Sequence, residues 1–367
     1  AASDVYKRQI QTMPEQLISD EFAETDLIEA RTGGSTGKPL RVLFDIRTQE
    51  RRNAAQARSN DWAGAQLGMA QVGLWGNPKI DFSIKARLRH NLLDRLSFVD
   101  TVGFDDSSAQ EFVDTWLAEN ARVIFGHAHS IYLLAQYLQK SGEQRVRPDA
   151  IISTSMSLLK SQRELIESVF HCPVSDRYGC EEVGLIASQC EAHEGFHINM
   201  EHVLVEVVDD NDQPCPPGEP GQILVTDLCN HGMPLLRYRV GDIATVSEER
   251  CSCGRESLLL ENIGGRIADF LLTRENAHVA GISLIERTLT AFPGLEQMQV
   301  VQEELERFEI NYVPATNFSP DCLGQIRQEF EVVFGTGIEV NFTQMDSIPQ
   351  QKSGKYRFSI CKVNYEL

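Results

Sequence analysis

The sequence lacks long runs of uncharged apolar residues, internal repeats and low-complexity tracts. A transmembrane helix needs about 18 or more consecutive, mainly apolar residues, so we expect no membrane span. Of the 367 residues, 42% are hydrophobic and 24% are charged, which are ordinary fractions for a globular protein. We also expect no long disordered stretches, because apolar segments recur along the whole chain.

Positive charge is the second deficit of this sequence. The chain has 34 Lys and Arg residues against 53 Asp and Glu residues, which gives a formal net charge of −19. So acidic a protein repels the phosphate backbone of DNA or RNA. We therefore expect no general nucleic-acid binding.

A secretory signal is also missing from the start of the sequence. The chain opens at Ala1 with a polar segment that has neither an apolar core nor a clear cleavage site. Its nine cysteines are an odd number, which favours free thiols or metal ligands over a disulfide framework. We therefore expect a cytoplasmic protein whose natural N-terminus was trimmed or is missing.

The length suits about two domains of common size. Apolar spacing predicts helices and strands in alternation, which indicates an α/β fold with helix-covered sheets. From 197 to 249, strands joined by turns predict a β-rich subdomain. Glycines at 264 and 265 predict the boundary between a large N-terminal domain, 1–264, and a small, mobile α+β C-terminal domain, 265–367. The expected helices are 48–70, 112–120, 130–142 and 161–170, and the expected strands include 149–158, 202–210, 221–228 and 243–247.

A loop rich in glycine and hydroxyl residues lies near the start of the chain. Its glycines let the backbone approach an anion closely, and its hydroxyls and lysine add donors. Only three residues separate Gly33 from Gly37, and Pro39 follows Lys38, so the segment is not a Walker loop. The pattern predicts a phosphate-binding loop, and an ordinary polar turn is the alternative. The residues concerned are Thr32, Gly33, Gly34, Ser35, Thr36, Gly37 and Lys38.

Three further segments carry residues suited to a nucleotide. Tyr178, Gly179 and Glu182 combine a ring that can stack on a purine with a carboxylate that can hold a hard cation. Asp242 follows a strand and a glycine, where it could accept ribose hydroxyls; a solvated turn residue is the alternative. Lys355 lies on a short polar loop from which it could reach a phosphate, and solvated surface is its alternative.

A metal site is predicted from cysteine and histidine spacing. Cys190 and His197 precede the pair Cys251 and Cys253, and together they would complete a tetrahedral Cys₃His set. Thiolates favour zinc over magnesium or calcium, and four protein ligands indicate a structural site. Free thiols are the alternative reading, and His193 is a competing ligand.

Taken together and in this order, these segments resemble the adenylate-forming superfamily of acyl- and aryl-CoA ligases. The resemblance extends over residues 31–358. The segments RYGCEEVG (177–184), CSCGR (251–255) and KSGKYRF (352–358) resemble its phenylacetate–CoA ligase-like branch. That branch includes homologues linked to capsular polysaccharide biosynthesis and coenzyme-adenylylating synthetases.

The resemblance implies roles for individual residues. The loop at 32–38 would hold phosphates, Glu182 would be the catalytic carboxylate that binds Mg²⁺, and Asp242 would bind the ribose. Lys355 would be the catalytic lysine of the C-terminal domain. The other ATP- or AMP-binding residues implied are Ser155, Tyr178, Gly179 and Arg266.

Two features depart from the family pattern. A longer segment normally precedes the phosphate loop, so we expect part of the N-terminal subdomain to be missing. The hinge motif usually reads Gly-Arg-x-Asp-Asp, whereas Ala268 stands at the first Asp position and only Asp269 remains.

The implied reaction is ATP-dependent activation of a carboxylic acid. Transfer of AMP replaces an oxide leaving group with a phosphate ester and releases pyrophosphate, after which CoA forms a thioester. Rotation of the C-terminal domain about the hinge would separate the two steps. The expected ligands are ATP, Mg²⁺, CoA, a small carboxylic acid and structural Zn²⁺, and a homodimer is left open. The alternatives are an adenylyltransferase or ligase that uses a non-CoA acceptor, and a non-catalytic scaffold of the same fold.

Overall fold

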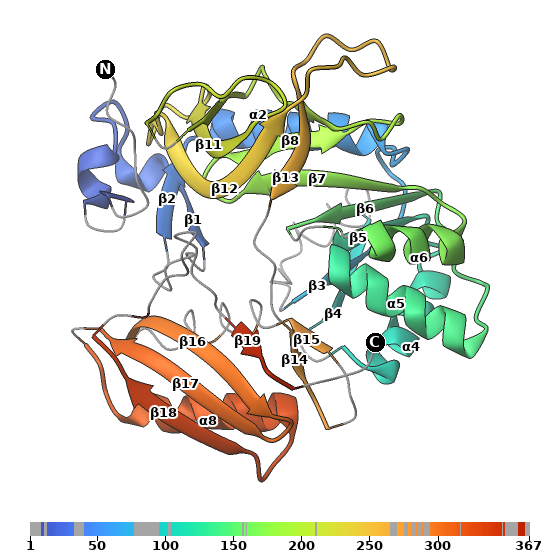
Figure 1. Cartoon of the computed structure of the whole chain (residues 1–367), viewed down its shortest axis with the longest axis vertical. Coiled ribbons are helices and arrows are strands. Elements are labelled where there is room, and N and C mark those ends of the chain that lie inside the picture. Colours follow the sequence, from blue (N-terminus) through green and yellow to red (C-terminus); the bar gives the residue numbers. More distant parts are fainter. Residues whose placement is uncertain are drawn as a thin grey trace.

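One large mixed sheet and one small mixed sheet organise the chain in the computed structural model (Figure 1). None of the helices in the described part of the chain is both long and apolar enough to cross a bilayer. The structure describes residues 9–10, 13–32, 40–76, 95–101, 104–155, 158, 160–209, 211–264, 270–274, 278–280, 284, 288, 294–315, 317–346, 348 and 359–363.

A β-hairpin near the N-terminus brackets the predicted phosphate loop. Its strands pair antiparallel, with Thr32 opposite Leu40, so the two ends of that loop lie side by side. Leu40, Val42 and Leu43 are buried in a core shared with the large sheet. The elements are η1 (Pro14–Leu17), η2 (Glu24–Asp26), β1 (Ile28–Thr32) and β2 (Leu40–Phe44).

The first half of the large sheet is parallel and helix-covered. Helices α4, α5 and α6 pack on one face through a core of aliphatic and aromatic residues. Residues just after α2 pack on the opposite face. The strands lie in the order β7-β6-β5-β3-β4. The elements are α2 (Ile46–Trp62), β3 (Gln71–Trp75), β4 (Leu96–Asp100), α4 (Asp106–Ala118), β5 (Val123–His127), α5 (Ala128–Ser141), β6 (Ala150–Thr154), α6 (Lys160–Phe170) and β7 (Val174–Cys180).

The second half of the large sheet is antiparallel. It continues from β7 in the order β8-β9-β13-β12-β11-β10, completing an 11-stranded sheet. Strand β7 pairs parallel with β6 and antiparallel with β8, so the expected β-rich subdomain is hydrogen-bonded directly to the helix-covered half. The strands are β8 (Gly184–Gln189), β9 (Phe196–Ile198), β10 (Val203–Val208), β11 (Pro220–Asp227), β12 (Tyr238–Val246) and β13 (Leu259–Gly264).

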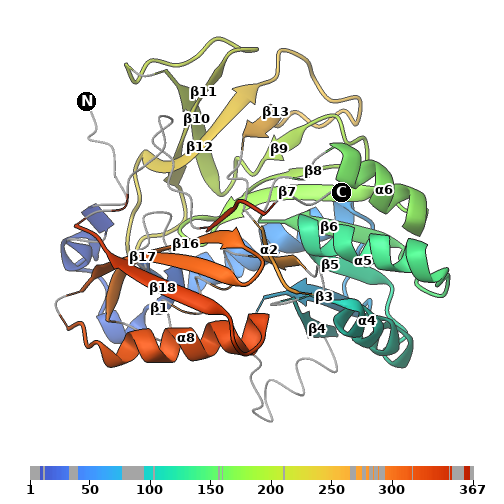
Figure 2. The same cartoon turned by 60° about the horizontal axis from the view of Figure 1, so that its bottom comes forward.

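The C-terminal part has its own α+β core. A four-stranded sheet in the order β18-β17-β16-β19 is covered by α8 (Figure 2). All buried members of this core lie between residues 271 and 348. The elements are β14 (Phe270–Leu272), β15 (His278–Ala280), β16 (Leu295–Glu304), β17 (Arg307–Pro314), α8 (Asp321–Phe334), β18 (Glu339–Gln344) and β19 (Ser359–Cys361).

Most predicted elements are present, and their ends follow local capping. The helix predicted at 130–142 is α5, which stops before Gly142 in the left-handed region at φ 71°. The helix predicted at 48–70 is shorter, because α2 ends at Trp62. Glycines at 64 and 68, with φ of 83° and 88°, turn the chain there toward β3.

Candidate active site

The turn between β7 and β8 carries Glu182. The ladder shifts register between Tyr178 and Gly179, just before the turn. A Cβ at Gly179 would lie 2.5 Å from the carbonyl oxygen of Gly184, and Gly184 itself has a φ of +76°. Only glycine fits both positions without moving the backbone. The glycines of this motif are therefore needed to form the turn itself.

Two tyrosine–carboxylate hydrogen bonds join this turn to β12. The Tyr178 hydroxyl donates to Oδ2 of Asp242 at 2.9 Å, and the Tyr238 hydroxyl donates to Oε1 of Glu182 at 2.7 Å. Both carboxylates are buried, so these bonds replace hydration lost on folding. The structure thus brings Tyr178, Glu182 and Asp242 together, as residues of one site would be.

Tyr238 was given no role by the sequence reasoning, although a signal for it existed. It lies four residues before Asp242 on the same strand, and even spacing along a strand places side chains on one face. A search for partners at even spacing from Asp242 would have found it.

The remaining predicted nucleotide residues are only partly placed. Thr32 is the last residue of β1, and exposed Ser155 follows β6 with a left-handed φ of 68°. The others lie outside the described residues: Gly33, Gly34, Ser35, Thr36, Gly37, Lys38, Arg266, Ala268, Asp269 and Lys355. The structure therefore gives the positions of the two strand ends that flank the phosphate loop, and of the Glu182 and Asp242 carboxylates.

The carboxyl ends of β3 and β5 carry neighbouring aromatic rings, and Arg177 of β7 lies beside them. The Trp75 ring lies 4.3 Å from the His127 ring and 5.5 Å from the Phe125 ring. The Arg177 guanidinium lies 4.7 Å from the Phe125 ring centroid and donates to Asn60 at 2.9 Å. Ligands of open α/β sheets bind at this edge, so an acid or a nucleotide base could rest here.

His127 is buried at the start of α5. It occupies the N-cap position without making a side-chain cap bond, so its ring fills space against Trp75. Burial lowers the pKa of His127 to about 4, and the imidazole is therefore neutral near pH 7. Its Nδ1 has no hydrogen-bond partner among the described residues.

The four predicted zinc ligands lie together, near the end of β8 and the start of β9. Donor atoms of Cys190, His197, Cys251 and Cys253 all lie within 4.8 Å of one another. The Sγ atoms of Cys190 and Cys251 are 3.5 Å apart, and Sγ of Cys253 is 3.4 Å from Nε2 of His197. His193, the competing ligand, is not in this group of described residues.

The surroundings of this cluster orient its donors. Nδ1 of His197 lies 2.7 Å from Oγ of Ser257, an arrangement that leaves Nε2 facing the sulfurs. The Arg255 amide donates to Sγ of Cys253 at 3.5 Å. Burial and the neighbouring sulfurs raise the pKa of Cys251 to about 12, so without a cation this thiol stays protonated.

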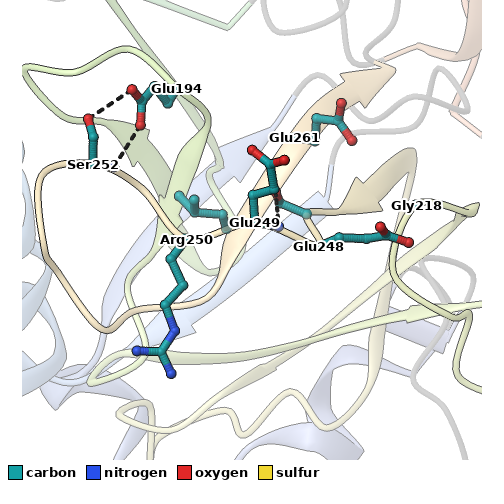
Figure 3. A pocket seen from close by; sticks show the side chains of 9 residues that line it. Glu194, Gly218, Glu248, Glu249, Arg250, Ser252 and Glu261 are labelled. Carbon is teal, nitrogen blue, oxygen red and sulfur yellow. Dashed lines mark hydrogen bonds between the residues drawn. The ribbon is translucent and has the colours of Figure 1, made fainter.

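A hollow of about 860 Å³ lies beside the loop that carries Cys251 (Figure 3). Four carboxylates line it, from Glu194, Glu248, Glu249 and Glu261. The amide and hydroxyl of Ser252 donate to Glu194 at 2.7 and 2.8 Å, which ties the loop to the segment before β9. Arg250 also lines the hollow, and neither Glu182 nor Asp242 does, so the hollow is separate from the Glu182–Asp242 site.

A relative matches nearly the whole chain, and a family model matches its C-terminal part. Residues 271–362 match the CapK C-terminal domain family. Over 362 residues the chain is 23% identical to Protein CapK of Staphylococcus aureus, covering 97% of this chain and 79% of that protein. Over 101 residues it is 40% identical to phenylacetate-coenzyme A ligase of Thermus thermophilus, covering 26% of this chain and 23% of that ligase.

Solved structures share the arrangement of sheets. A structure of 2-hydroxyisobutyryl-CoA ligase with 2-HIB-AMP and CoA matches with a TM-score of 0.61 at 15% identity, covering 98% of this chain and 80% of that chain. This is the fold of the adenylate-forming enzymes. The adenylate-forming fold accounts for the mixed large sheet and the small C-terminal sheet, and it confirms the α/β class and the resemblance expected from the sequence.

Proposed function

We propose that this protein is an AMP-forming acid–thiol ligase that adenylates a carboxylic acid with ATP and passes the acyl group to CoA. The observation that carries the proposal is the meeting of Tyr178, Glu182 and Asp242 on the adenylate-forming fold. Relatives named phenylacetate-CoA ligase and a structural neighbour that holds an acyl-AMP and CoA support the same reaction.

The buried carboxylates suit the two ends of a nucleotide. Glu182 offers a hard oxygen donor, the ligand type that Mg²⁺ prefers, and Mg²⁺ there would neutralise charge on the triphosphate. Asp242, oriented by the Tyr178 hydroxyl, would accept the ribose hydroxyls. The loop at 32–38 would hold the leaving pyrophosphate, and Lys355 would contact the α-phosphate.

Two units and a hinge would serve the two half-reactions. We propose the boundary at 264/265, with Ala268 and Asp269 in the hinge. Support comes from β13, which ends the large sheet at Gly264, and from the C-terminal core, whose buried members all come from later residues. Rotation about such a hinge would move Lys355 out of the active site and bring a CoA-binding surface into its place.

We also propose a structural zinc ion bound by Cys190, His197, Cys251 and Cys253. The short S–S and S–N separations support it, because four tetrahedral ligands must converge within a few ångströms. None of the nine cysteines, all of them within the described residues, forms a disulfide, which supports a reducing compartment such as the cytoplasm.

The test is carboxylate-dependent exchange of labelled pyrophosphate into ATP by the purified chain, across a panel of acids. We expect Lys355→Ala to lower exchange about 100-fold, the usual effect of losing one transition-state contact. Lys362→Ala is the matched control, because exposed Lys362 pairs only with half-buried Glu303 among its described ionic contacts. Consumption of CoA distinguishes a thiol acceptor from another acceptor. Equal exchange by both variants would remove Lys355 from the reaction, and absence of exchange with every acid would refute adenylation.

A further inference from the structure

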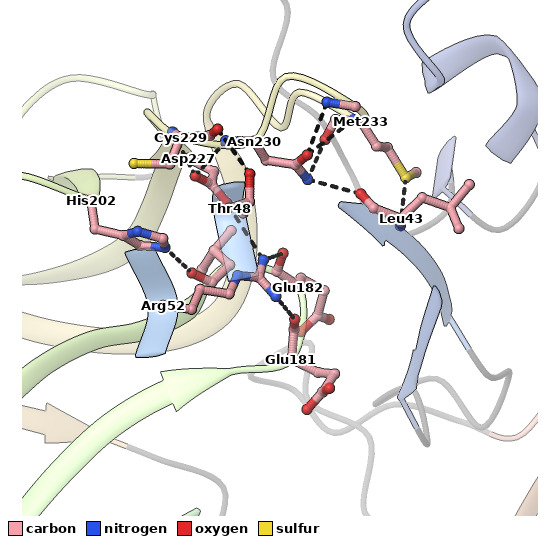
Figure 4. A network of polar contacts seen from close by, with 12 residues as sticks. Leu43, Thr48, Arg52, Glu181, Glu182, His202, Asp227, Cys229, Asn230 and Met233 are labelled. Atoms are coloured by element: carbon pink, nitrogen blue, oxygen red, sulfur yellow. Dashed lines mark hydrogen bonds and ion pairs between the residues drawn. The ribbon is translucent and has the colours of Figure 1, made fainter. Parts of the chain in front are cut away.

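Buried Arg52 of α2 holds the backbone of the turn that carries Glu182 (Figure 4). Its Nη1 donates to the carbonyl oxygen of Glu181 at 3.2 Å, and its Nη2 donates to the carbonyl oxygen of Glu182 at 2.8 Å. The aliphatic part of Arg52 packs where a Cβ at Gly184 would be, 3.1 Å from its Cγ. One side chain therefore fixes two successive peptides of the turn.

Arg52 is itself fixed by a carboxylate and a ring. Nη2 lies 3.5 Å from Oδ2 of Asp227, and the Arg52 and Asp227 side chains are 7% and 0% exposed. The guanidinium also lies 4.2 Å from the ring centroid of Phe44, on the strand that follows the predicted phosphate loop. A guanidinium can satisfy these planar contacts together, which an ammonium group cannot.

His202 holds the next peptide of the same turn. Its Nε2 donates to the carbonyl oxygen of Val183 at 2.9 Å, so three consecutive carbonyls, those of residues 181 to 183, bond to buried side chains. Donors of His202, Asp227 and Cys229 lie within 4.8 Å of one another. The nearby Arg52 cation disfavours a metal ion in this group, which leaves positioning as its role.

The segment around Asp227 also reaches the hairpin of the phosphate loop. Oδ1 of Asp227 accepts a hydrogen bond from the backbone N–H of Asn230 at 3.1 Å. The side-chain amide of Asn230 donates to the carbonyl oxygen of Leu43 at 2.9 Å. The Thr48 hydroxyl donates to the carbonyl oxygen of Cys229 at 2.9 Å. One continuous network of described residues thus links the Glu182 turn to β2.

We propose that Arg52, Asp227 and His202 form a clamp that sets the position of the Glu182 carboxylate relative to the phosphate-loop hairpin. They are positioning residues, since they act through the backbone of the turn. The proposal rests on the proposed function, in which Glu182 binds the Mg²⁺ that accompanies ATP. Mutation of a residue that orients a metal ligand usually lowers metal affinity or activity by roughly 10- to 100-fold.

Arg52→Lys tests the clamp, with Arg58→Lys as the matched control. Arg58 lies on the same helix but bonds the next turn, donating to Asn199 and Glu201 at 2.6 Å. We expect Arg52→Lys to raise the half-saturating Mg²⁺ concentration for pyrophosphate exchange about 10-fold or more, and excess Mg²⁺ to restore part of the rate. Arg58→Lys should leave this Mg²⁺ dependence at the wild-type value.

Hydrogen exchange supplies a readout that needs no activity. Amides of residues 181–186 should exchange at least about 10-fold faster in Arg52→Lys, whereas Arg58→Lys should affect only residues 199–203. If Arg52→Lys does not fold, Asp227→Asn, which keeps the shape and removes the charge, replaces it. Wild-type Mg²⁺ dependence with unchanged exchange at 181–186 would overturn the clamp. A wild-type protein inactive with every acid would refute the proposed function instead, and hydrogen exchange would still decide whether the clamp holds the turn.

Discussion

The two halves of the 11-stranded sheet are stabilised by different kinds of contact. The parallel half, β3 to β7, packs on α4, α5 and α6 through an apolar core that includes Val72, Phe112 and Ile131. The antiparallel half also has an apolar core, but the Arg52–Asp227 ion pair and the cysteine cluster lie within or beside it. Non-directional burial therefore stabilises both halves, and the antiparallel half adds directional polar contacts around the Glu182 turn.

This difference separates stability from positioning. An apolar core tolerates changes of side chain when volume is kept, whereas a buried polar network fails when one partner is lost. The turn with Glu182 is at the junction of the halves and receives its contacts from the polar side. Glu182, the proposed magnesium ligand, thus lies where several buried side chains determine its position.

The largest expected effect comes from the cysteine cluster. Cys251→Ala should prevent binding of the proposed zinc ion and lower the free energy of unfolding by more than about 4 kcal/mol, because loss of a structural metal belongs to the most damaging class of mutations. Zinc content by elemental analysis and urea unfolding measure this.

Cys229→Ala is the control for that prediction. Cys229 is buried beside His202 and Asp227, in the group with the Arg52 cation, so its removal should leave one zinc per chain. Substoichiometric zinc in the wild type, or equal stability of the Cys251→Ala variant, would contradict the zinc site. Loss of zinc from Cys229→Ala would show that the two groups of the antiparallel half are not independent.

In the parallel half, the expected effect depends on pH. The His127 pKa is about 4 in the folded state against 6.5 normally, so the unfolded chain binds the extra proton between these values. Stability is therefore lost as pH falls from about 6.5 to 4, by about 3 kcal/mol at the lower end. His127→Phe, which keeps a ring against Trp75, should remove this part of the loss in urea unfolding between pH 7 and pH 4. A variant with the wild-type pH slope would show that His127 does not titrate as a buried group.

The smallest effect compares one glycine from each half. Gly142 and Gly184 have similar φ values of 71° and 76°, but a Cβ at Gly142 has no atom within 4 Å, whereas one at Gly184 meets Arg52. We expect Gly142→Ala to cost about 1 kcal/mol and Gly184→Ala about 2 kcal/mol, since only the latter adds crowding to backbone strain. Thermal unfolding of both variants tests the difference, and equal costs would mean that Arg52 moves aside freely.

The same contrast explains what the sequence could predict. Helices α5 and α6 and strand β6 have periodic apolar residues, and their positions follow from that pattern. The cysteine cluster was also accessible, because the distinctive Cys-x-Cys-Gly turn indicated it. Glu182 and Asp242 could be proposed from their motifs, although their shared environment could not.

Arg52 shows why the rest could not be predicted. It lies in a helix with several other arginines, and nothing in the local spacing distinguishes it from exposed Arg51. Its role arises from Asp227 and the Glu182 turn, which are more than 120 residues away in the chain. Side-chain contacts of such separation depend on the assembled fold, so periodicity and motif spacing do not contain them.

Strand β7, at the junction of the two halves, does not tolerate a change in its number of residues. It is bonded to β6 on one edge and to β8 on the other, with Arg177 beside Phe125 and Tyr178 beside Asp242. Insertion of one residue would exchange the faces to which these two side chains point. Between Val174 and Gly179, natural variants should therefore change in composition without insertions or deletions, whereas the surface loops can vary in length.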